Sequence, residues 1–276
     1  MRKRIGLALG GGGARGIAHL PYIQALDALG LKPHIISGTS IGAIVGGFYA
    51  SGKSGIKLEK LIKSIGFKEL TQFVDLSLLS DRALLKGKGV EEFLEEHIGV
   101  TTFEALSIPL KIVTTDFWNR KPVVFDSGDL IPAIRASISL PAVFEPVKHN
   151  KQILVDGGAL NPVPYDVIRD ACDVLIAIDV NGTRAPSAKH RLPNMFDNIM
   201  GTFETMQTSI EYYKQLVYPP DLLVKPPLVN IGVLDFHRAD AILKDVRPEI
   251  PEFKKQILKL TRPEKKKRWF SFFALP

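Results

Sequence analysis

The chain has 276 residues, of which 45% are hydrophobic and 24% are charged, and its formal net charge is +7. This composition is ordinary for a globular protein and can form one large α/β domain or two small ones. Residues 262–276 contribute +4 of the +7. The rest of the chain is therefore only mildly basic, and we expect no nucleic-acid-binding face.

The chain has one cysteine, Cys172, which excludes an internal disulfide. The basic N-terminus is followed by the apolar run Ile5–Leu9, which is too short for a secretory signal and leads directly into four glycines. No segment approaches the ~18 uninterrupted apolar residues that a membrane span requires. We therefore expect a cytoplasmic protein.

Apolar segments and helical patterns alternate along the chain, separated by short glycine-containing turns. This alternation predicts one doubly wound α/β domain with a mostly parallel sheet. The expected strands are Ile5–Leu9, Ile35–Ile36, Leu110–Thr115, Val123–Phe125, Ile153–Val155 and Val174–Val180. The expected helices are Ala14–Leu29, Ile41–Ala50, Leu58–Ile65, Val90–Ile98 and Ile131–Ile138.

Residues 181–194 form a polar segment with two prolines, which predicts a loop. From Phe196 to Val217, apolar residues recur at three- and four-residue spacing, which predicts a helix with one apolar stripe. The simplest interpretation is that this stripe packs onto the sheet. Its methionines and aromatic residues would also suit a lid that faces lipid.

The first of three notable glycine turns is Gly10–Gly16, between the first strand and the first helix. Consecutive glycines let backbone N–H groups converge at a helix N-terminus, where they can bind a phosphate or stabilise an oxyanion. Gly11, Gly13 and Gly16 also match the dinucleotide-binding fingerprint. That interpretation requires an acidic residue about 20 positions further on, but residues 32–34 are Lys-Pro-His. No nucleotide is therefore expected here.

The other two turns supply a hydroxyl and a carboxylate. Gly38-Thr39-Ser40-Ile41-Gly42 has the form of a nucleophile elbow, in which a serine is exposed on a sharp strand-to-helix turn. Asp156-Gly157-Gly158 follows an apolar strand and places a carboxylate at its end, where it could activate Ser40 as a base. Each turn alone is weak evidence, but three at strand ends in one chain indicate a catalytic site.

Together these turns resemble the patatin-like phospholipase family. The resemblance covers about residues 4–182 and is supported by the segment from Arg135 to Pro146. It implies a three-layer α/β fold with a Ser-Asp dyad, in which Ser40 is the nucleophile and Asp156 the base. It also implies an oxyanion hole from the amides of Gly11, Gly12 and Gly13, and it requires no cofactor and no metal. Supporting positions in the same motifs are Arg15, Gly38, Gly42, Gly157 and Gly158.

Arg15 matches a basic position of the family. It could steer an anionic head group or anchor the glycine loop, and the sequence does not decide between these roles. The resemblance gives a core over residues 1–182. Beyond it, where no family motif is recognised, we expect a helical part over 183–260 that packs on the core and a tail over 261–276.

Other motifs offer competing interpretations. Residues 47–54 match the Walker A pattern, but they follow helix-like residues where a phosphate loop requires a strand. The six histidines show no metal-ligand spacing; His19 is expected to be a packing residue, whereas His149 and His237 stay open as triad members. Asp116 and Asp126 also end strand-like segments and could replace Asp156 as the base.

The tail joins a basic cluster, residues 265–268, to Trp269 and three phenylalanines. This combination suits peripheral contact with an anionic membrane surface, such as the inner membrane, and a disordered solubilising tail is the alternative. The sequence as a whole predicts a serine acyl hydrolase that acts on phospholipids, lysophospholipids or related acyl esters through an acyl-enzyme. The alternative is a catalytically silent lipid-binding or regulatory protein on the same scaffold.

Overall fold

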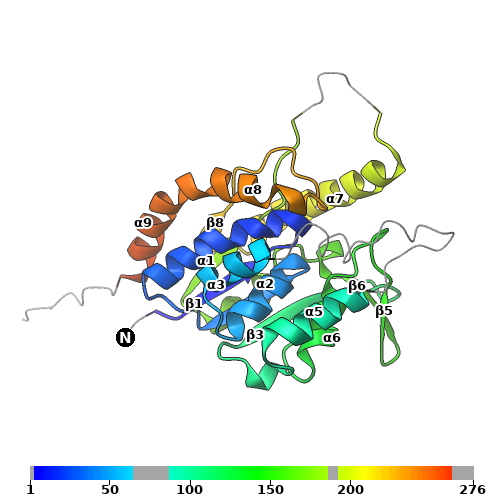
Figure 1. Ribbon diagram of the computed structural model, residues 1–276, viewed down its shortest axis with the longest axis horizontal. Helices are drawn as coiled ribbons and strands as arrows, with labels where there is room; N and C mark the ends of the chain where they lie inside the picture. Colours follow the sequence, from blue (N-terminus) through cyan, green and yellow to red (C-terminus); the bar gives the residue numbers. More distant parts are fainter. Residues whose placement is uncertain (1–2, 65–86, 186–191, 263–276) are drawn as a thin grey trace, which may run out of the picture.

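The computed structural model describes residues 3–64, 87–185 and 192–262. Its centre is an eight-stranded mixed sheet in the order β5-β6-β3-β2-β1-β7-β8, with β4 paired to β3 off this path (Figure 1). The strands β1, β2, β3, β7 and β8 are parallel, whereas β4 and β6 run antiparallel to β3 and β5 runs antiparallel to β6. The strand bounds are β1 Ile5–Leu9, β2 Ile35–Thr39, β3 Leu110–Asp116, β4 Lys121–Phe125, β5 Val147–His149, β6 Gln152–Asp156, β7 Val174–Ile178 and β8 Leu222–Val224.

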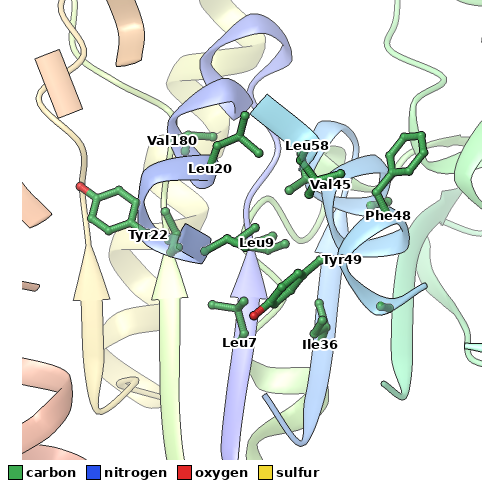
Figure 2. Close-up of a cluster of buried hydrophobic side chains, with 14 of the residues drawn as sticks. Leu7, Leu9, Leu20, Tyr22, Ile36, Val45, Phe48, Tyr49, Leu58 and Val180 are labelled. Carbon is green, nitrogen blue, oxygen red and sulfur yellow. The ribbon is translucent and has the colours of Figure 1, made fainter. Parts of the chain in front are cut away.

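Helices cover one face of the sheet and bury most of the apolar residues (Figure 1). In this core, Leu7, Leu9 and Ile36 of the central strands meet side chains of α1 and α2, including Leu20 and Tyr49 (Figure 2). The helices that contribute to it are α1 His19–Ala28, α2 Ile41–Ala50, α3 Gly55–Ser64, α5 Lys88–Ile98, α6 Leu130–Ser137, α8 Ala239–Val246 and α9 Ile250–Thr261.

A smaller core lies on the opposite face, where Ala8, Ile35 and Leu175 of the strands contact Tyr165 and Ile168. Cys172 belongs to this second core and is buried. The sheet is therefore packed on both faces, as the sequence predicts for an α/β fold. No helix among the described residues is long and apolar enough to span a membrane.

Most expected elements are present with ends shifted by a few residues, and the first helix shows the clearest difference. The segment Gly13–Ala18 is a 3₁₀ helix, and α1 begins only at His19. Pro21 then falls in the first turn of α1, where its missing N–H leaves no helical hydrogen bond unmade.

The long helix α7, Met195–Val217, contradicts the expected packing of its apolar stripe on the sheet. Its buried residues are Met200, Glu204, Gln207 and Glu211, whereas Met206 and Tyr213 are 60% and 64% exposed. The helix turns its polar side inward because loops beneath it carry a guanidinium, a carbonyl and an N–H that need partners.

Candidate active site

The nucleophile elbow is present as the sequence predicts. Ser40 follows β2 and precedes α2 with a φ of 55°, a conformation that a non-glycine residue adopts only under constraint. A Cβ on Gly42 would lie 2.1 Å from the carbonyl oxygen of Leu9, and one on Gly38 would lie 2.5 Å from the carbonyl oxygen of Gly42. The two flanking glycines are therefore required by close backbone packing.

Ser137, a residue that the sequence analysis did not single out for a role, holds the elbow in place. Its hydroxyl accepts a hydrogen bond from the Ser40 N–H at 2.9 Å and donates one to the carbonyl of Val113 at 2.7 Å. Ser137 is fully buried at the end of α6. It links the elbow to the neighbouring strand β3, and only its place in the Arg135–Pro146 segment hinted at this in the sequence.

Asp156 reaches the elbow by a route that the sequence did not predict. The sequence places Asp156 at the end of a strand but does not give the direction of that strand in the sheet, and β6 is antiparallel to β3. The strand β3 extends beyond β2, since Thr39 pairs with Val113 and three residues of β3 follow. β6 pairs with this overhang and places Asp156 opposite Thr114, one residue beyond the level of Thr39.

The turn after Asp156 is tightly fixed. Asp156 Oδ1 accepts a hydrogen bond from the Gly158 N–H at 2.7 Å. A Cβ on Gly157 would lie 2.2 Å from the carbonyl oxygen of Val113, so only glycine fits there. The carboxyl group is 1% exposed, and among the described residues its Oδ2 makes no hydrogen bond of good geometry.

The structure brings Ser40 and Asp156 into one small cavity, whose lining includes the glycine loop Gly11–Gly13. Burial raises the pKa of Asp156 to about 6, and contact with the Ser40 side chain and the Gly158 N–H opposes part of that rise. The buried carboxyl is therefore a stronger base than an exposed aspartate.

The three predicted oxyanion donors are not equivalent. The Gly11 N–H donates to the carbonyl of Pro162 at 2.9 Å, so it is not available to a substrate. Among the described residues, the N–H groups of Gly12 and Gly13 have no such partner. This corrects the prediction for Gly11: its role is to anchor the loop, and two candidate donors remain.

Arg15 anchors the same loop through its buried side chain. Its side chain is 3% exposed and donates to the carbonyl oxygens of Gly12 and Asn181 and to Glu204 Oε1, at 3.1, 2.6 and 3.0 Å. Burial lowers the pKa of Arg15, and the nearby Glu204 carboxylate opposes this. Of the two roles left open by the sequence, the structure supports anchoring, because a buried guanidinium cannot attract a head group from solvent.

A much larger apolar cavity also opens at Ser40. Its volume is about 510 Å³, within the range of small-molecule binding sites. Its walls come from α1, α2, α3 and α5, from residues 138–144 and from residues 233–240. Side chains that line it include Leu20, Ile44, Val45, Phe48, Leu58 and Phe93.

Comparison with known proteins identifies the family of the chain. A model of the patatin-like phospholipase family matches residues 7–168. The chain belongs to this family. It is 37% identical over 193 residues to the NTE family protein Rv1063c of Mycobacterium tuberculosis, a match that covers 70% of this chain and 53% of the relative.

Two further matches have lower sequence identity. The chain is 28% identical over 266 residues to "Lysophospholipase NTE1" of Saccharomyces cerevisiae, covering 87% of this chain and 16% of that protein. The solved structure of VipD from Legionella pneumophila matches with a TM-score of 0.50 at 13% identity, covering 92% of this chain and 67% of that one, and shows the shared fold. The chain spans about half the length of Rv1063c and of its counterpart from Mycobacterium bovis.

The competing candidates of the sequence analysis are placed elsewhere or held by other partners. Asp116 accepts hydrogen bonds from Asn119 and Gln152, and His149 packs against Phe125 at the sheet edge. His19 is buried against the Gly10 carbonyl, and burial lowers its pKa to about 4. Asp126 is exposed and lies 3.9 Å from Lys111.

His237 lines the large cavity, as does Asp240, but it does not line the small cavity that holds Asp156. The Walker A match lies in α2 and in the turn after it, as predicted, with Gly52 at a φ of 99°. Within the described ranges, no group of three or more His, Cys, Asp or Glu side chains could hold a metal ion.

Proposed function

We propose that this patatin-like protein is a serine hydrolase that cleaves acyl esters of lipids, with Ser40 as nucleophile and Asp156 as base. The observation that carries the proposal is that Ser40 faces two cavities at once. One holds the buried carboxyl and the glycine loop, and the other is a large apolar space. This arrangement supplies a base and candidate oxyanion donors on one side and a binding site for an acyl chain on the other.

The reaction follows from these positions. Ser40 Oγ attacks the ester carbonyl carbon while its proton moves to Asp156, and the N–H groups of Gly12 and Gly13 stabilise the oxyanion. Asp156 then gives the proton to the leaving alcohol, which breaks the ester bond and leaves an acyl-enzyme. Water attacks this acyl-enzyme with Asp156 as base, and the fatty acid leaves with Ser40 protonated again.

The cavity also indicates the substrate class. It is a single apolar space that meets the site at Ser40, so it fits a lipid from which one acyl chain is removed. Lysophospholipids and other single-chain esters match this shape, in agreement with the printed name of the yeast relative. Each methylene buried in the cavity would contribute up to about 0.8 kcal/mol to binding.

The test is Ser40→Ala, assayed with a lysophospholipid and a p-nitrophenyl acyl ester, together with labelling by a fluorophosphonate probe. We expect hydrolysis and labelling to be lost while the fold is kept, and Ser51→Ala at the other end of α2 to keep both. Turnover by Ser40→Ala would refute the assignment. If the unchanged protein binds lipid but neither labels nor hydrolyses, it is the silent lipid-binding protein considered as the alternative.

We also propose peripheral membrane contact through residues 262–276, of which 263–276 lie outside the described residues. The support is the sequence alone, a basic cluster next to aromatic residues. Deletion of the segment should weaken co-sedimentation with anionic vesicles, and unchanged binding would reject the contact. The cytoplasmic location, at or near an inner membrane surface, stays a prediction.

A further inference from the structure

The buried side of α7 is polar where a helix that covers a sheet is usually apolar. Glu204, Gln207 and Glu211 are 9%, 5% and 1% exposed. Burial of a carboxylate or an amide is unfavourable unless each polar atom finds a partner. The contacts of these side chains therefore indicate what the inward side of the helix is for.

Glu204 acts on the glycine loop through Arg15. Its Oε1 accepts a hydrogen bond from Arg15 Nη2 at 3.0 Å, while its Oε2 pairs with Arg184 at 2.9 Å. The Gly12 carbonyl oxygen in turn accepts from Arg15 Nε at 3.1 Å and from the Arg15 backbone N–H at 3.2 Å. Because a peptide unit is planar and trans, a fixed Gly12 carbonyl also fixes the direction of the Gly13 N–H.

Gln207 acts on the aspartate turn through Gly158. Its Nε2 donates to the Gly158 carbonyl at 3.2 Å, and the N–H of the same glycine donates to Asp156 Oδ1 at 2.7 Å. A Cβ added to Gly158 would lie 2.3 Å from Gln207 Nε2 and 2.9 Å from Asp156 Oδ1. The amide of Gln207 thus closes the turn that holds the carboxylate.

We propose that Glu204 and Gln207 are positioning residues for hydrolysis, through which α7 holds the oxyanion donors and the base in register around Ser40. Their three-residue spacing places both on one side of the helix. Neither is assigned a chemical step, since each acts through another residue. This inference rests on the proposed function of the Ser40 site.

For Gln207, the test compares Gln207→Leu with Gln207→Glu by steady-state kinetics. Gln207→Leu removes the donor and should lower kcat by about 10- to 100-fold while KM changes little, because the apolar cavity is untouched. Gln207→Glu adds a carboxylate beside Asp156, in a small cavity whose other charged groups are Arg15 and Glu204. In a plot of kcat against pH, the acidic midpoint should therefore shift to a pH higher by roughly one unit.

For Glu204, the test is the rate of fluorophosphonate labelling, which depends on the oxyanion donors and not on the leaving alcohol. Glu204→Gln weakens the hold on Arg15 and should slow labelling by about tenfold or more. The matched control is Arg184→Ala, which removes the second ion-pair partner of Glu204 but leaves the contact between Arg15 and the glycine loop in place. It should label at the rate of the unchanged protein.

A second control separates positioning from the general stability of the helix. Asn194 caps the N-terminus of α7 by accepting a hydrogen bond from the Asp197 N–H at 2.8 Å, and neither residue lines the small cavity at Ser40. Asn194→Ala should lower Tm but keep kcat within about twofold when it is assayed well below its own Tm. The positioning role is overturned if Gln207→Leu and Glu204→Gln keep full activity, or if Asn194→Ala loses as much as they do. In either case the unchanged protein still hydrolyses, so the proposed function is tested separately by Ser40→Ala.

Discussion

Ser40 and Asp156 lie between two walls of opposite character. On one side, Ile44, Val45 and Phe48 belong to an apolar cavity formed by packed helices. On the other, the inward side of α7 presents Glu204 and Gln207, each hydrogen-bonded to a loop of the site. The apolar wall suits a flexible chain of variable length, whereas the polar wall suits groups that must keep fixed directions.

The difference follows from the two kinds of interaction. Hydrophobic contact is non-directional and scales with buried area, so the cavity can accept chains in many conformations. Hydrogen bonds weaken steeply when their angles change, so they can fix a carbonyl or a carboxylate in one orientation. Substitutions in the apolar wall should therefore change which substrate is used, and substitutions in the polar wall should change how fast any substrate reacts.

The largest effect is expected where the two walls meet, at Asp156. Asp156→Asn keeps the acceptor for the Gly158 N–H but removes the base, and it should lower kcat by about 10²- to 10⁴-fold for every chain length. In the unchanged protein, activity should fall as pH drops through about 6, where the carboxyl becomes protonated. Full activity in Asp156→Asn, or an acidic limb that titrates far from this value, would contradict the assignment of the base.

The same substitution should stabilise the fold at high pH. Burial raises the pKa of Asp156 from 3.8 to about 6, so the folded state disfavours the charged form. Above pH 6 the charged carboxylate lowers the free energy of unfolding by about 3 kcal/mol, and Asp156→Asn should restore this amount. Below pH 4 the carboxyl is neutral in the folded and the unfolded state, so the substitution should give no such gain. Urea unfolding at pH 8 and at pH 4 measures the difference, and an equal gain at both values would exclude this origin.

The polar wall should be sensitive to the loss of one partner of its ion pair. Arg15→Met leaves Glu204 buried with only the partly exposed Arg184, and should lower the free energy of unfolding by about 3–5 kcal/mol. The double substitution Arg15→Met with Glu204→Leu removes both buried charges and should recover most of that stability. Its kcat should stay low, because the Gly12 carbonyl then keeps the backbone N–H of residue 15 but loses the side-chain donor Arg15 Nε. Recovery of activity together with stability would show that the pair matters only for folding.

The apolar wall should respond through chain length. Val45 is almost fully buried and lines the cavity, so Val45→Phe should fill part of it and exclude the last methylenes of a long acyl chain. Each methylene excluded reduces binding by up to about fourfold, so a long-chain ester should lose about tenfold or more in kcat/KM. Short-chain esters should be unaffected. The matched control is Ile56→Phe on the exposed surface of α3, and an equal loss on all chain lengths would reject the cavity as the acyl site.

The apolar wall was largely predictable from the sequence, because its elements follow helical and strand periods. Elements such as Ile41–Ala50 and the elbow at Ser40 are local features, set by residues adjacent in the chain. Asp156 was also identified, from its place at the end of a strand, but the pairing that brings it to Ser40 was not. Its position depends on how far β3 extends beyond β2, a register that no local pattern of residues encodes.

The polar wall was not predictable in the same way. The apolar spacing of α7 indicated a helix correctly but suggested the wrong buried side, because hydrophobic periodicity says nothing about distant polar groups that need partners. Arg15, Gly158 and Val163 determine which side of α7 faces inward, and they lie 48 to 189 residues along the chain from their partners on α7. One signal was available in the sequence, namely the polar residues Glu204, Gln207 and Glu211 at helical spacing directly beside the stripe.

The smallest effect is expected at the rim of the apolar cavity, where Lys63 and Asp240 form an ion pair at 3.3 Å. Their side chains are 44% and 88% exposed, so water screens the pair and Asp240→Asn should leave Tm unchanged within error. Because both residues line the cavity, removing the negative charge should change KM for an anionic lysophospholipid more than KM for a neutral ester. A change of a few fold is expected in the anionic case, decreasing as salt rises. An equal change in KM for both substrates would show that Asp240 affects binding through the shape of the cavity and not through its charge. Charged groups would then matter only on the buried side of α7.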